Sequence, residues 1–227
     1  MGVWPPADSR NPSLSAARCS LNQDGRSGQE ILASDPAVIV DPTVLPEGLP
    51  EPEDDGAASH LPGRRMPTLA LPSTSGGTAR VDLAPAGTER LVLYAYPRTG
   101  RPGERPLTED WDLIPGARGC TPESCGFRDH AAELWAAGAA VVGVSTQPTE
   151  DQREVVERLG LPFPLLSDPD LRLASALGLP THVVAGQRLL KRLTLVVRQR
   201  RIEHVFYPVF PPDTHAVHVL AWLLAVR

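Results

Sequence analysis

Continuous apolar runs alternate with helix-like segments after residue 67, and this alternation limits the folds open to the chain. Two runs have the composition of strands buried on both faces, Leu91–Tyr96 and Ala139–Val144. A segment with helical punctuation, from Pro122 to about Ala137, lies between them. Strands joined by a crossover helix lie parallel in one sheet, so this part of the chain predicts a β-α-β unit.

The remaining segments complete an α/β domain. We expect helices over residues 150–159 and 170–177, each closed by a glycine, with a short strand over 163–166 between them. An antiparallel hairpin over 193–207 and a final helix over 213–226 follow. A β-α-β half followed by a β-β-α half is the thioredoxin-like arrangement, in which helices flank a central mixed sheet.

Residues 1–66 differ in composition from the rest of the chain. They are rich in proline, serine, glycine and acidic residues and have no strand or helix period, so we expect a largely disordered N-terminal arm. Cys19 lies in this arm without a partner for reactivity in the surrounding sequence. A short hairpin over residues 69–83 opens the second part, so the predicted division is an arm, 1–66, and one domain, 67–227.

Charge and hydropathy exclude several classes of function. The net charge is −5, which argues against a protein that binds nucleic acid or an anionic membrane. No apolar run approaches the roughly 18 residues that a membrane span needs, and the start lacks the pattern of a signal peptide. Three cysteines are too few for a disulfide-stapled secreted protein, so the expected compartment is the cytoplasm.

Two of the cysteines bracket the start of the long predicted helix. In Cys120-Thr-Pro-Glu-Ser-Cys125, Thr121 suits the N-cap and Pro122 the first helical position. The helix N-terminus stabilises a thiolate more than a thiol, so we expect a depressed pKa at Cys120. The alternative is that Cys120 is a small buried hydrophobe.

The spacing of five residues constrains what this pair can do. On an intact helix it separates the two Cα atoms by about 8 to 9 Å, whereas a disulfide needs about 4.4 to 6.8 Å. Cys120 and Cys125 can therefore join only if the helix unwinds, as in a catalytic cycle. Zinc binding by Cys120, Cys125 and His130 is disfavoured because these positions spiral around the helix. Without a glycine-rich phosphate loop, we expect no cofactor and no metal.

The segment Gly119–Asp129, GCTPESCGFRD, resembles the active-site segment of peroxiredoxins of the bacterioferritin-comigratory, or Q, type. Three further stretches resemble the same family in the same order: Leu69–Thr74, Val141–Ser145 and Leu161–Asp168. The resemblance covers about residues 67–227.

This resemblance implies a thiol-dependent peroxidase acting on hydrogen peroxide or organic hydroperoxides. It makes Cys120 the peroxidatic nucleophile, Cys125 the resolving cysteine and Arg192 the active-site arginine, with Glu123 orienting a guanidinium. A Cys120–Cys125 disulfide would be reduced by thioredoxin or a glutaredoxin, in a monomer or dimer. On the residues alone, Arg192 is equally compatible with a basic, solvated stretch.

The sequence also departs from the family pattern. The family's Thr or Ser three residues before the nucleophile is Ala117 here, so Thr99 or Thr121 would have to supply the hydroxyl. The 22 residues between Pro97 and Cys120 are more than the family usually has and predict an inserted loop. A redox sensor using the same cysteines, or a non-catalytic thioredoxin-like binding module, stays open.

Overall fold

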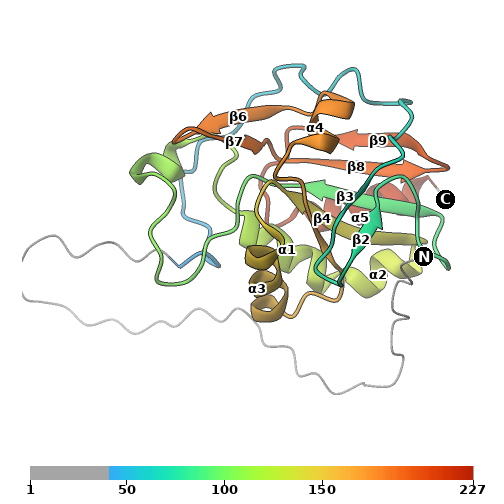
Figure 1. Cartoon of the computed structure of the whole chain (residues 1–227), viewed down its shortest axis with the longest axis horizontal. Helices are drawn as coiled ribbons and strands as arrows, with labels where there is room; N and C mark the ends of the chain where they lie inside the picture. The colour runs from blue at the N-terminus through green and yellow to red at the C-terminus, as the bar shows by residue number, and fades with distance from the viewer. Residues whose placement is uncertain (1–40, 227) are drawn as a thin grey trace, which may run out of the picture.

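The computed structural model describes residues 41–226, and the predictions for residues 1–40, including Cys19, lie outside this range (Figure 1). A five-stranded sheet in the order β5-β4-β3-β8-β9 forms the centre. Strands β3, β4 and β5 are parallel, and β8 and β9 run antiparallel to their neighbours. Their bounds are β3 Arg90–Ala95, β4 Ala139–Ser145, β5 Leu165–Ser167, β8 Leu193–Arg198 and β9 Arg201–Phe206. The predicted mixed sheet is confirmed.

Five α-helices flank this sheet within residues 41–226. They are α1 Cys120–Asp129, α2 Ala131–Ala136, α3 Thr149–Leu159, α4 Arg172–Leu177 and α5 His215–Ala225. The single helix predicted up to about residue 137 is two helices, because the backbone leaves helical geometry at His130 (φ −104°, ψ 9°). None of these helices is long and apolar enough to cross a bilayer.

Two small antiparallel sheets lie outside the central one. The predicted first hairpin pairs β1 Ala70–Pro72 with β2 Thr78–Arg80, so its second strand begins three residues earlier than expected. The hairpin of β6 Thr181–Val184 and β7 Gln187–Leu190 was not expected from the sequence. Its turn is formed by Ala185 and Gly186, both with positive φ, and alanine gives no signal for that conformation.

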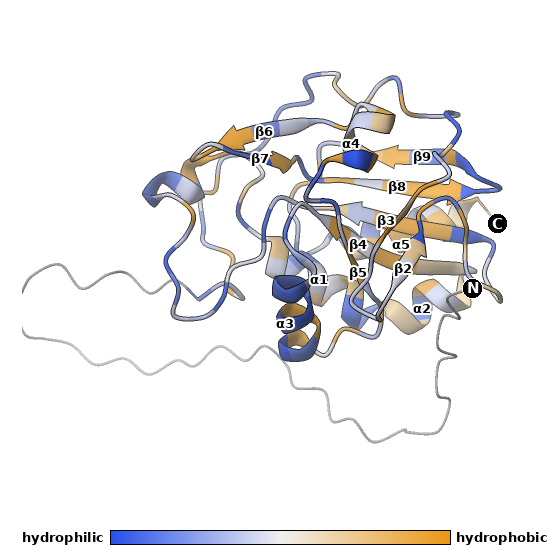
Figure 2. Ribbon diagram, in the orientation of Figure 1, coloured by the Kyte–Doolittle hydropathy of each residue, from blue (hydrophilic) through white to orange (hydrophobic). Residues whose placement is uncertain are grey.

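Alternate side chains of the central strands enter two separate apolar clusters. In β3, Leu91 and Leu93 join the cluster covered by α4 and the β1–β2 hairpin. Val92 and Tyr94 join the cluster covered by α1, α2, α3 and α5. Hydrophobic residues accordingly predominate along β4 and β8 in Figure 2. The sheet is therefore buried on both faces. The carboxyl ends of the parallel strands remain available for a functional site.

Residues 41–66 differ from the expectation of a disordered arm, because they pack against the domain. Leu61 is fully buried and Met66 is 2% exposed, both within the first cluster. The segment also bonds to β9, where the Gly63 N–H donates to the Ile202 carbonyl at 2.7 Å. The apolar residues here are too widely spaced to give a period, so only the tertiary contacts reveal their role.

The loop between Pro97 and Cys120, predicted as an insertion, builds a small core of its own. Within it, the 3₁₀ helix η1, Glu109–Leu113, places Trp111 in a third cluster. Ala117 joins this cluster together with Val184 of β6 and Leu189 of β7. The loop is thereby held against the β6–β7 hairpin and leads directly into α1.

If residues 41–66 are part of the folded domain, truncation of a buried side chain there must reduce its stability. We expect Leu61→Ala to lower the free energy of unfolding by about 2 to 5 kcal/mol. The matched control Leu113→Ala, at a side chain that is 71% exposed, should change it by less than about 0.5 kcal/mol. Urea denaturation checks both values, and equal effects would show that the segment does not pack as described.

Candidate active site

Helix α1 begins at Cys120, and Gly119 is its N-cap with φ 101°. A Cβ on Gly119 would lie 2.3 Å from the Cγ of Pro212, so only glycine fits between the inserted loop and the chain before α5. The predicted helix is present, but it begins at Cys120 and not at Pro122, and its N-cap lies two residues before Thr121. Cys120 is consequently the first helical residue, at the positive end of the helix dipole.

Arg192, which directly precedes β8, brings a guanidinium to this helix start. Its Nη2 lies 3.1 Å from the Cys120 sulfur, and its Nη1 donates to Oε2 of Glu123. All three residues are buried, at 2%, 0% and 3% exposure for Cys120, Glu123 and Arg192. The structure thus brings together three of the four residues that the sequence singled out.

The end of the inserted loop orients the same guanidinium. Nη2 of Arg192 also donates to the carbonyl oxygens of Arg118 at 3.1 Å and Gly116 at 3.3 Å. The Cys120 thiol lies 3.5 Å from the carbonyl oxygen of Ala117. These backbone carbonyls were not foreseen, because a sequence gives no signal for a main-chain acceptor in an irregular loop.

Burial raises the pKa of the Cys120 thiol, which corrects the expectation of a depressed value. The positive charge of Arg192 lowers the pKa and the charge of Glu123 raises it, while a backbone N–H of Arg98 also favours the thiolate. The expectation took account of the helix N-terminus and not of the loss of water around a buried sulfur. Arg192 is therefore the main group that favours the thiolate.

Glu123 is likewise shifted by its surroundings. Burial raises its pKa to about 7, although the ion pair with Arg192 opposes the rise. Its second oxygen, Oε1, has no hydrogen-bond partner among residues 41–226. The carboxylate therefore has one main contact, the guanidinium, whose orientation it helps to set.

Cys125 is not brought to Cys120. The two residues lie five positions apart on α1, which is a continuous helix over both. Cys125 is partly buried and packs against the cluster beneath α1. Neither residue is in a disulfide, as expected if the helix must unwind before they can join.

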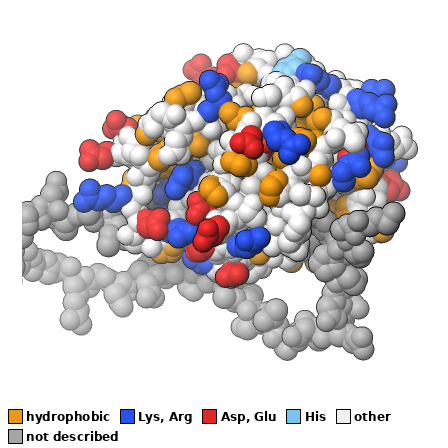
Figure 3. Space-filling view, in the orientation of Figure 1, with side chains coloured by type: hydrophobic (Ala, Val, Ile, Leu, Met, Phe, Trp, Pro, Cys, Tyr) orange, Lys and Arg blue, Asp and Glu red, His pale blue; other side chains and the backbone are white. Residues whose placement is uncertain are grey.

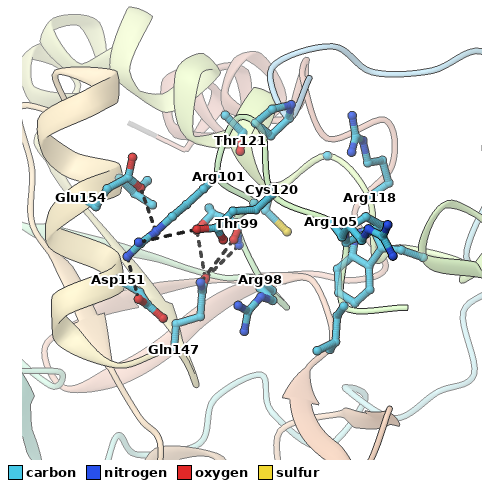
Figure 4. A pocket seen from close by; sticks show the side chains of 18 residues that line it. Arg98, Thr99, Arg101, Arg105, Arg118, Cys120, Thr121, Gln147, Asp151 and Glu154 are labelled. Atoms are coloured by element: carbon cyan, nitrogen blue, oxygen red, sulfur yellow. Dashed lines mark hydrogen bonds and ion pairs between the residues drawn. The ribbon is translucent and has the colours of Figure 1, made fainter. Parts of the chain in front are cut away.

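A cavity of about 150 Å³ opens beside Cys120, and Figure 4 shows its lining side chains. Both candidate hydroxyls, of Thr99 and Thr121, line it. The Thr99 hydroxyl donates to Oε1 of Gln147 at 3.0 Å, and its N–H donates to the same oxygen at 2.8 Å. Gln147 was missed, although it follows β4 at the carboxyl edge of the sheet, where ligands bind in α/β folds.

No group of three potential metal ligands comes together within the described residues. His130, considered with the cysteines in the sequence, lies at the end of α1 and contacts Glu133 instead.

His215, at the start of α5, supports α1 from the other side. Its Nε2 lies 2.8 Å from the Thr194 hydroxyl, and its ring packs edge-on against Phe127 of α1. Burial, aided by the nearby Arg192 charge, lowers its pKa to about 3. The imidazole is therefore neutral inside the folded protein at physiological pH.

The chain matches the family model described as Redoxin over residues 61–220. A putative peroxiredoxin of Mycobacterium tuberculosis is 34% identical over 117 residues, which are 52% of this chain and 63% of that protein. The match to this relative thus covers less than two thirds of its length. Peroxiredoxin Bcp of Escherichia coli is 31% identical over 170 residues, which are 71% of this chain and 94% of that one.

Solved structures of the same kind superpose on the domain. Peroxidoxin BcpB of Mycobacterium tuberculosis has a TM-score of 0.57 at 29% identity, covering 74% of this chain and 98% of that one. Peroxiredoxin Q of Xanthomonas campestris has a TM-score of 0.53 at 26% identity, covering 69% and 90%. The expected thioredoxin-like fold is confirmed.

Removing the Arg192 charge should raise the pKa of Cys120 further. We expect Arg192→Gln to shift the midpoint of the pH dependence of Cys120 alkylation to higher pH. Each pH unit of this shift lowers the thiolate fraction at neutral pH about tenfold. Iodoacetamide labelling in a background of Cys19→Ser and Cys125→Ser measures it. Arg198→Gln, at a half-exposed arginine on β8, is the charge-matched control. An unchanged midpoint in Arg192→Gln would contradict the assigned contact.

Acid should destabilise the domain through His215. Because its folded pKa of about 3 lies below the ordinary 6.5, its contribution is complete above pH 6.5 and is lost as the pH falls toward 3. Between pH 6.5 and 5 we expect a loss of about 2 kcal/mol. Urea denaturation at each pH gives the free energy of unfolding of wild type and of His215→Gln, and the change in their difference with pH isolates this loss. His218→Gln, at an exposed histidine, is the control. A pH-independent difference would refute it.

Proposed function

Because the chain belongs to the peroxiredoxin family, we propose that it is a thiol-dependent peroxidase that reduces hydrogen peroxide or organic hydroperoxides at Cys120. The observation that carries the proposal is the Arg192 guanidinium, 3.1 Å from a sulfur that lines a cavity. A cysteine that served only as a small buried hydrophobe would need neither a buried cation nor an opening beside it.

In the first step the Cys120 thiolate attacks the distal oxygen of the peroxide. A sulfur–oxygen bond forms, the O–O bond breaks, and the leaving oxygen takes up a proton as water or an alcohol. The sulfur is oxidised to a sulfenic acid and the peroxide is reduced. Negative charge moves from sulfur to the leaving oxygen, so a donor that reaches both favours the transition state.

Thiolate formation cannot supply the acceleration, because burial raises the pKa of Cys120. Electrostatic stabilisation must supply it, and we assign that role to Arg192 and the backbone N–H of Arg98. Arg192 is the catalytic arginine in this scheme. Glu123 touches no reacting atom and is a positioning residue, since it bonds the opposite Nη of the guanidinium.

Resolution requires Cys125. Its thiol condenses with the sulfenic acid to give a Cys120–Cys125 disulfide and one water molecule. Helix α1 must unwind for this step, since both cysteines lie on it. We further propose that thioredoxin or a glutaredoxin in the cytoplasm reduces the disulfide through thiol–disulfide exchange.

A redox sensor is the second candidate. The observation that favours it is the continuous helix over both cysteines, because a disulfide there changes the shape of α1 as well as its chemistry. A sensor would react once and stay oxidised, whereas a peroxidase turns over with a dithiol reductant.

Intact-mass analysis of the reduced protein with one equivalent of peroxide tests the assigned roles. We expect wild type to lose two hydrogens rapidly, because both thiols are consumed. Cys120→Ser should lose this reaction, and Cys125→Ser should gain one oxygen as a trapped sulfenic acid. Cys19→Ser, at the third cysteine, is the matched control and should behave like wild type.

Three results would contradict the proposal. If wild type reacts no faster than a free thiol, the peroxidase function is ruled out. Fast oxidation without turnover on added thioredoxin would favour the redox sensor. A Cys120→Ser variant that still reacts would place the nucleophile elsewhere.

A further inference from the structure

The cavity beside Cys120 is lined by arginine side chains that the peroxidase chemistry does not use. Arg98, Arg105 and Arg118 all line it, and all three belong to the inserted loop. Figure 4 shows Arg105 on the side toward which the Cys120 sulfur points, and Asp151 and Glu154 on the opposite side. Asp151 and Glu154 are thus separated from Arg105 across the opening, and a third lining acid, Glu104, lies 3.8 Å from Arg101.

The acids on the far side are already paired. Asp151 accepts from Arg101 at 2.9 Å, and Glu154 accepts from Arg158 at 2.6 Å. Their charges are consequently balanced within that side of the cavity.

The arginines on the sulfur side have little compensation. No described acid lies within 4 Å of Arg98 or Arg105, whereas such contacts do occur for Arg101. Arg118 donates to the carbonyl oxygens of Asp41 and Val44, and its nearest described carboxylate is 3.8 Å away. Positive charge therefore remains beside the reactive sulfur.

This charge is a local feature of the cavity. Acidic and basic side chains are interspersed over the face seen in Figure 3, and the chain carries a net charge of −5. A general attraction of anions to the protein is not expected from that balance. Selection of an anion would depend on the groups that line the opening.

The size and lining of the cavity suit a compact molecule. Its volume is about 150 Å³. Much of its lining near Cys120 is polar, including Thr99, Thr121 and Gln147. A long acyl chain is poorly matched to such a lining, and a compact polar molecule is well matched.

We propose that Arg105, together with Arg98, makes the site selective for short hydroperoxides that carry a carboxylate close to the peroxide group. This inference rests on the proposed peroxidase function and names its substrate class. The carboxylate accepts from a guanidinium while Cys120 attacks the distal oxygen. The O–O bond breaks, the leaving oxygen takes a proton, and the product is the corresponding hydroxy acid.

A matched pair of hydroperoxides tests the inference. In 2-hydroperoxy-2-methylpropanoate a carboxylate replaces one methyl group of tert-butyl hydroperoxide. The readout is the ratio of their rate constants for Cys120 oxidation, divided by the same ratio for free cysteine. We expect wild type to favour the anion by about tenfold, as for a charge-assisted hydrogen bond in a partly open site.

Variants assign the preference to the proposed groups. Arg105→Gln should bring the normalised ratio close to one, and Arg105→Lys should retain part of it because the charge remains. Arg153→Gln removes the same charge from an exposed position on α3 outside the cavity, and should keep the wild-type ratio. The wild-type preference should also fall with added salt.

The outcomes separate this inference from the peroxidase itself. If hydrogen peroxide does not oxidise Cys120, the proposed function fails. If it does, but the normalised ratio in wild type is one, only the substrate class fails. The selectivity would also be overturned if Arg105→Gln lowered the rate constants of both hydroperoxides equally. The same holds if Arg153→Gln lowered the normalised ratio as much as Arg105→Gln does.

Discussion

The ion pair of Arg192 and Glu123 is buried beside the Cys120 sulfur, and the rest of the site is arranged around it. Taking two charges out of water is costly, and hydrogen bonds to their remaining polar atoms reduce that cost. The carbonyls of Gly116 and Arg118 accept from Nη2, whereas Nε of Arg192 and Oε1 of Glu123 have no partner within residues 41–226. The pair joins α1 to the start of β8, so loss of either partner would leave a charge buried and unbalanced.

Segments far apart in the sequence enclose the helix start that must later open. Gly119 is packed by Pro212 and Leu45, and Gly116 lies against Pro52. Residues 41–55 thus lie directly on the end of the inserted loop. In the proposed disulfide step, unwinding of α1 would therefore disturb contacts outside the helix and link the redox chemistry to the packing of the N-terminal segment.

Strong local patterns made much of this structure predictable, and long-range packing decided the rest. The buried runs of β3 and β4 and the start of α1 near Cys120 follow from composition and spacing. The β6–β7 hairpin, the packing of Leu61 and the contact of Gln147 with Thr99 carry no local pattern. The pKa of Cys120 was expected in the wrong direction, because burial cannot be counted before the enclosing segments are placed.

The central claim is that Glu123 favours the reaction only by holding Arg192 against the sulfur. A double-mutant cycle on the rate constant of Cys120 with hydrogen peroxide tests it, using Glu123→Gln, Arg192→Gln and the double variant. The account predicts that the double variant reacts no more slowly than Arg192→Gln alone, since the positioned group is already gone. Losses that add in full would contradict it and would require a separate role for Glu123.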